Sequence, residues 1–147
     1  MIPLAGAIAG LKRNQLALKF ALEREVRLGM EEAAVEARSF IGVEQAGWAA
    51  LADSTIAEKQ RLGYPTPHPL ERTGELKDSI SSEAETIPGG VHGVVGSTSD
   101  LAVLHEVGTS RMPARPFLGP ALMLTEPKIA VALAELAVRT LTPGSRP

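Results

Sequence analysis

The chain has 147 residues, a formal net charge of −2, no cysteine and only five aromatic residues. This length fits one domain, large enough to remove roughly two-thirds of its unfolded surface from water, and the composition excludes collagen-like and disordered classes. The lack of cysteine excludes disulfide scaffolds, thiol nucleophiles and thiolate zinc sites. The near-neutral charge, without a basic run, argues against a protein whose main function is to bind nucleic acid. We expect a core in which helices pack small residues closely.

The first eleven residues are apolar, but the positive pair Lys12-Arg13 follows them instead of preceding them. That order is wrong for a signal peptide, and the segment is too short to cross a bilayer. We interpret residues 1–11 as a mobile or partner-docking arm. Residues 142–147 are predicted to be a flexible tail, so residues 12–141 form a single domain.

From Lys12 to about Phe40 the sequence predicts a long amphipathic helix. Its apolar residues recur at intervals of three and four, as a buried helix face requires. The members of this stripe are Leu18, Leu22, Val26, Met30, Ala33, Ala37 and Phe40. Because the polar face carries both acids and bases, packing on a core or a partner helix is favoured over a membrane surface.

Two short helices are expected next. The sequence Thr55-Ile-Ala-Glu58 has the spacing of a capping box and predicts a helix that ends before Gly63. Residues 64–69 hold three prolines and indicate a loop. Thr73 is the predicted N-cap of a second short helix that carries Leu76 and Ile80 on one face.

The following segment predicts a hairpin. Residues 82–87 and 91–97 have the character of strands, and Pro88-Gly89-Gly90 forms the turn between them. The second strand is rich in glycine, which permits the close approach of a backbone partner.

The last third of the domain predicts two helices joined by an extended segment. Residues 101–107 favour a helix closed by Gly108, and Pro113 and Pro116 keep residues 112–118 from being helical throughout. A final helix is expected to begin at Pro120 and to kink at Pro127. The predicted fold class is therefore α+β, with a long N-terminal helix, a small antiparallel β-sheet, short helices and a kinked C-terminal helix.

Few residues suggest chemistry. His105-Glu106 resembles half of a zinc-binding helix, but position 109 is Thr where the second His would stand. We favour ordinary hydrogen bonding for both residues and keep a small metal-dependent hydrolase using them as the alternative function. Arg111 and Arg115 suit either phosphate binding or a loop held by Arg-to-carbonyl bonds, and we favour the loop or a protein contact. No nucleophile elbow or phosphate loop is present, and we predict no cofactor.

Five motif blocks nevertheless occur in a distinctive order. They are Trp48-x-x-Leu51-x-x-Ser54-Thr55-x-x-x-Lys59, Leu70-x-x-Thr73-Gly74-x-Leu76-x-x-Ser79-Ile80, Val95-Gly96-Ser97, His105-Glu106-x-Gly108-Thr109 and Met112-Pro-Ala-Arg-Pro-Phe-Leu118-x-Pro120-Ala-Leu122. Over about residues 48–122 this series resembles the tail-completion and virion-morphogenesis family of tailed bacteriophages and prophages. The chain departs from many members in having Leu101, Ala102 and Val107 around the His-Glu segment, where aromatic residues are common.

The resemblance implies a structural protein and not an enzyme. It implies a homo-oligomeric ring, hexameric in the family, at the head–tail junction of the virion, assembled in the bacterial host cytoplasm. The implied partners are other neck, connector or head-closure, tail terminator or tail tube proteins, with DNA passing through the lumen without specific binding and no membrane involved. The interface or structural candidates are Trp48, Thr73, Gly74, Leu76, Glu106, Gly108, Thr109, Pro113, Arg115, Pro116, Phe117 and Leu118.

Two alternatives remain open for the proline-rich segment. A rigid loop that loses little entropy on docking could present Arg115 and Phe117 to a neighbouring subunit as anchors. Alternatively, Phe117 fills the core of its own subunit and Arg115 pins the loop.

Overall fold

A computed structural model describes the backbone of residues 4–141 and the side chains of residues 12–140. The fold is α+β, as predicted, and it is mostly helical. Its elements are α1 (Leu4–Phe40), α2 (Asp53–Leu62), α3 (Glu75–Asp78), β1 (Ile80–Ile87), β2 (Gly90–Ser97), α4 (Asp100–Val107) and α5 (Leu118–Leu141). The predicted flexible tail, residues 142–147, lies outside the described residues.

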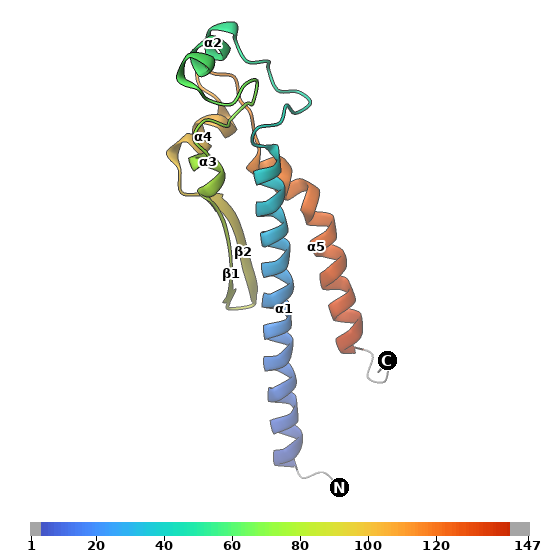
Figure 1. The fold of residues 1–147 in the computed structure, drawn as a ribbon. Coiled ribbons are helices and arrows are strands. Elements are labelled where there is room, and N and C mark those ends of the chain that lie inside the picture. Colours follow the sequence, from blue (N-terminus) through green and yellow to red (C-terminus); the bar gives the residue numbers. More distant parts are fainter. Residues whose placement is uncertain (1–3, 142–147) are drawn as a thin grey trace.

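Helix α1 lies at the centre of the fold, with the β1–β2 hairpin on one side and α5 on the other (Figure 1). It begins at Leu4, so most of the segment predicted as a separate arm continues the helix. The reason lies in the composition of residues 4–11, which include three alanines, the residue with the strongest helix propensity.

The hairpin confirms the predicted strands and extends them. Strands β1 and β2 pair antiparallel, with Ile80 opposite Ser97 and Ala84 opposite Gly93. Gly93 faces α1, and a Cβ atom there would lie 2.7 Å from Val26 Cγ1 and 2.8 Å from Met30 Cγ. The close approach expected at this strand is therefore made by the chain's own helix.

Helix α5 packs on the other side of α1, and a glycine lies at this contact too. A Cβ atom at the buried Gly29 would overlap the side chain of Ile129, so the absence of a side chain lets the two helices approach. Helix α5 begins at Leu118, two residues before the predicted start at Pro120, and it continues through Pro127. The bend expected at that proline stays a prediction.

Both predicted side-chain caps are wrong. Helix α2 begins at Asp53 after the N-cap Ala52, so Thr55 lies inside the helix, although the helix ends before Gly63 as expected. Helix α3 has Gly74 as its N-cap, at φ 91°, and no side-chain cap. Ile80, expected at the end of that helix, is the first residue of β1.

The core lies where α1, α3, the hairpin, α4 and the start of α5 meet. Its buried members are mostly small or aliphatic, as predicted, and the one large ring is that of Phe117. They are Ala34, Ala37, Ile41, Leu76, Ile80, Ala102, Phe117 and Ala121. Trp48, Leu70, Val95 and Leu118 pack against this cluster while keeping part of their surface in water.

The close contact at Gly93 is testable by adding one methyl group. We expect Gly93→Ala to lower the free energy of unfolding by about 1–3 kcal/mol, because Val26 and Met30 must shift to admit it. The matched control is Gly96→Ala on the same strand, where a Cβ atom would meet nothing within 4 Å. Urea denaturation of the two variants should separate them, and equal stabilities would show that α1 does not constrain this strand.

Candidate functional site

The carboxylate of Glu106, on α4, closes the amino end of α5. Its Oε2 accepts hydrogen bonds from the amides of Phe117 (2.9 Å) and Leu118 (3.1 Å), and its Oε1 accepts one from the amide of Gly119 (2.8 Å). Amides at the start of a helix have no partner within the helix, and a negative charge there is favoured by the helix dipole. Glu106 is therefore a tertiary N-cap that ties α4 to α5.

The segment between these helices folds back on α4. The amide of Arg115 donates to the carbonyl of His105 (2.7 Å). Gly108 has φ 78°, and a Cβ atom there would lie 2.7 Å from the amide nitrogen of Ala114. Only glycine suits this crowded, left-handed position. We call Glu106, together with residues 108–119, the latch.

Thr109 builds the turn inside the latch. Its amide donates to the carbonyl of Met112 (2.8 Å), and its Oγ1 accepts hydrogen bonds from the amides of Arg111 (3.2 Å) and Met112 (3.1 Å). The exposed Pro113 and the half-buried Pro116 disfavour helical geometry at the residues before them, Met112 and Arg115. Both C-terminal motif blocks thus contain residues that build this local structure.

Arg115 and Phe117 are buried inside their own chain. One guanidinium nitrogen of Arg115 donates to the carbonyls of Ala49 (2.9 Å) and Ala50 (3.3 Å), and Phe117 is completely shielded in the core. In this geometry Phe117 fills the core of its own subunit and Arg115 pins the loop. In this conformation neither side chain is presented to a neighbouring subunit as an anchor.

The remaining candidates divide between the core and the surface. Leu76 is buried, and Trp48 and Leu118 pack against the same cluster as Phe117. Gly74 supplies the left-handed residue before α3, while Thr73 is exposed and caps nothing. The structure therefore brings residues of the first, second and last motif blocks together around one core, and not on one surface.

His105 lies beside the latch in a partly buried position. Burial lowers its pKa, and the positive charge of Arg115 lowers it further. Its Nδ1 atom and the Nε atom of Arg115 are both buried without a hydrogen-bond partner. Because both oxygens of the neighbouring Glu106 accept amide hydrogen bonds, this pair does not present two open metal ligands. Among the described residues, no group of three His, Asp or Glu side chains is placed to hold a metal ion.

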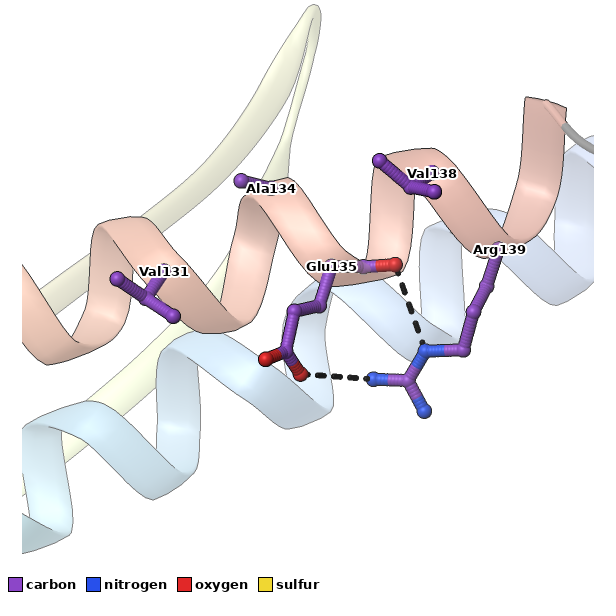
Figure 2. A pocket seen from close by; sticks show the side chains of 5 residues that line it. All are labelled: Val131, Ala134, Glu135, Val138 and Arg139. Atoms are coloured by element: carbon purple, nitrogen blue, oxygen red, sulfur yellow. Dashed lines mark hydrogen bonds and ion pairs between the residues drawn. The ribbon is translucent and has the colours of Figure 1, made fainter.

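One hollow of about 480 Å³ lies along α5 (Figure 2). It is lined by Val131, Ala134, Glu135, Val138 and Arg139. Glu135 and Arg139 form an ion pair at 3.6 Å, whereas the three small apolar side chains make up the rest of the lining. A smaller hollow of about 100 Å³ lies beside Trp48. The larger hollow suits apolar contact, since its only ionisable side chains pair with each other.

Sequence reasoning missed Lys59 as a structural residue. Its side chain is buried, and its ammonium group donates to the carbonyls of His68 and Glu71, which holds the proline-rich loop against α2. A lysine in a short polar helix gives no signal of such a role, because its partners are backbone atoms of a loop.

No protein-family model, curated protein or solved structure matches this chain. Between residues 4 and 141, none of the helices has the length and apolar character needed to cross a membrane.

The hydrogen bonds of Glu106 should contribute strongly to the stability of the fold. We expect Glu106→Ala to lower the free energy of unfolding by about 1.5–3 kcal/mol, because three amides at the start of α5 lose a charged acceptor. Glu106→Gln, which retains one carbonyl oxygen, should lose less. The control is Glu83→Ala on the exposed face of β1. If urea denaturation gives the same stability for Glu106→Ala and the control, the cap contributes nothing.

Because His105 has a lowered pKa, the stability of the fold should depend on pH with a definite sign. Its folded pKa lies below the ordinary value of 6.5, so below about pH 6.5 the unfolded chain takes up a proton that the folded chain does not. The free energy of unfolding should therefore fall as the pH falls, by at most about 1.4 kcal/mol per pH unit for one proton. In His105→Gln this slope should decrease, whereas His92→Gln, at an exposed position on β2, should retain it. Equal slopes in both variants would contradict the assignment to His105.

Proposed function

We propose that this chain is a structural protein of the head–tail junction of a tailed phage or prophage particle. In this proposal it assembles as a ring, with six copies, that joins or seals the capsid connector and the tail. It works by protein–protein contact and takes no cofactor. Its partners are further copies of itself and other neck, connector or head-closure, tail terminator or tail tube proteins.

The latch is the observation that carries this proposal. The blocks that most clearly resemble the family, His105-Glu106-x-Gly108-Thr109 and Met112-Pro-Ala-Arg-Pro-Phe-Leu118, form one hydrogen-bonded unit. In that unit Glu106 accepts hydrogen bonds from backbone amides, and Arg115 donates to backbone carbonyls. Gly108 allows the backbone of Ala114 to pass close by. Residues that recur in order because they build a scaffold support a structural role more than a catalytic one.

The surface of the chain also supports an assembly role. Many large apolar side chains are exposed, among them Val103, Val107, Met123 and Val131. Contiguous apolar surface marks protein–protein contacts, and Val103 and Val107 lie one turn apart on α4. The net charge of −2 suits a ring through which DNA passes, because strong neutralisation of phosphates would retard its transit.

The proposal is tested by deleting the gene from the genome that encodes it and imaging the particles produced by electron microscopy. We expect filled heads and tails that are separate from each other, and joined particles when the wild-type gene is restored. Complementation with Glu83→Ala, a surface change away from the latch, should also restore joined particles. Normally joined particles in the deletion strain would refute the proposed function.

A further inference from the structure

The sheet that the structure describes consists of β1 and β2 alone, so each strand has one edge without a neighbouring strand. The two-residue turn at Pro88-Gly89 makes residues 87 and 90 a hydrogen-bonded pair. At the other end of the hairpin, the amide of Thr98 donates to the carbonyl of Ser79 (3.1 Å). Hydrogen-bonded pairs alternate with unbonded pairs along an antiparallel ladder. The even-numbered residues of β2 therefore bond to β1, and the odd-numbered ones direct their backbone N–H and C=O groups away from it.

The odd-numbered residues Val91, Gly93 and Val95 form what we call the β2 edge. Within residues 4–141, no hydrogen bond from another element reaches their outward N–H and C=O groups. Unpaired backbone groups in a row are a template on which another strand can pair. The β2 edge thus offers three donors and three acceptors in the spacing of a strand.

The outer edge of β1 is different, because α1 occupies it. Arg27 donates to the carbonyl of Ala84 (3.2 Å), and Arg38 donates to the carbonyl of Ile80. Both carbonyls point away from β2, since Ile80 and Ala84 are the partners of odd-numbered residues on β2. Charged side chains and prolines are the usual means of protecting an edge strand from further pairing. Residues 90–97 contain no Lys, Arg, Asp, Glu or Pro, so the hairpin is protected on one edge and open on the other.

The two faces beside the β2 edge differ in chemistry. Gly93 lies against α1, and the half-buried Val91 and Val95 are on the same face of the strand. On the other face, Glu83 and Glu85 of β1 are exposed, and Glu83 has no ion-pair partner in the described part of the chain. A strand added to β2 lies two strand spacings, about 10 Å, from β1, a distance that a lysine side chain can span. Small apolar residues on the inner side and basic residues on the outer side therefore suit a strand at this edge.

We propose that the β2 edge binds an extended segment of a partner protein as an antiparallel third strand, with small apolar residues facing α1 and basic residues facing outward. Backbone hydrogen bonds supply the affinity of such strand addition, and the alternating side chains supply its specificity. A second copy of the hairpin does not offer this pattern, because β1 carries glutamates on its outer side and β2 has no lysine or arginine. The inference stands apart from the proposed function, since it rests on the backbone and the charges of the hairpin.

A short synthetic strand tests this proposal on the full chain. The probe is a peptide with blocked ends that alternates valine and lysine over about six residues, the usual length of a strand. Amide hydrogen exchange is followed by NMR with and without the peptide. We expect the amides of the β2 edge to exchange rapidly in the chain alone and about tenfold more slowly when about nine-tenths of the edge is occupied. The amides of His92 and Val94, which already bond to β1, should change by less than about twofold.

Two control peptides separate the contributions of backbone and charge. Methylating the valine amides, which face β2 in antiparallel pairing, should abolish the slower exchange because the peptide then lacks the donors. Replacing the lysines by glutamates should weaken binding, since Glu83 and Glu85 then repel the peptide.

Two proline variants test which amides of β2 point outward. Val91→Pro removes an outward N–H and no bond to β1, so it should retain the wild-type midpoint of urea denaturation. It should bind the peptide about fivefold more weakly, for the loss of one hydrogen bond. His92→Pro removes the bond from the amide of His92 to Glu85 on β1 and should lower the midpoint.

Unchanged exchange of the β2 edge in the presence of the lysine peptide would overturn the proposal, and so would equal slowing by the methylated peptide. Slow exchange in the chain alone that becomes slower with protein concentration would show a second copy on this edge and overturn it as well. Separate heads and tails in the deletion strain would support the proposed function whichever of these results is obtained.

Discussion

The acceptance of three backbone amides by the Glu106 carboxylate is the interaction on which the arrangement of the C-terminal half depends. It sets where α5 begins, and that start places Phe117 at the centre of the core. The same turn aims Arg115 at the carbonyls of residues 49 and 50, far away in sequence. One acidic side chain thereby joins α4, α5 and the loop after α1 into a single unit.

A second constraint acts along α1, which packs against other elements on two sides. The absence of side chains at Gly29 and Gly93 allows α5 and the hairpin to approach this helix more closely than an alanine would permit. Close approach also explains how so few aromatic residues suffice, since Ala34 and Ala37 of α1 are buried in the core cluster and need little space around them. Among the buried members of this cluster, Phe117 is the one aromatic residue.

The features that local chemistry determines could be predicted from the sequence. Pro88-Gly89 marked the hairpin turn, Gly63 and Gly108 marked helix ends, and Pro113 and Pro116 marked the extended segment. The caps at Thr55 and Thr73 were wrong because the helices begin at other positions: α2 follows Ala52, and α3 follows the left-handed Gly74. The role of Glu106 could not be derived, since its partners are amides 11 to 13 residues away that only the folded latch brings near. The buried Lys59 was missed for the same reason.

The latch also restricts the direction in which α5 can point. Glu106 bonds α4 to the first turn of α5, so α5 cannot turn away from α4 without losing three hydrogen bonds to a carboxylate. Further along, Ile129 packs on α1 where Gly29 has no side chain. A helix held at two separate points along its length has a defined axis, so the exposed side chains of α5 keep fixed positions relative to α1 and the hairpin.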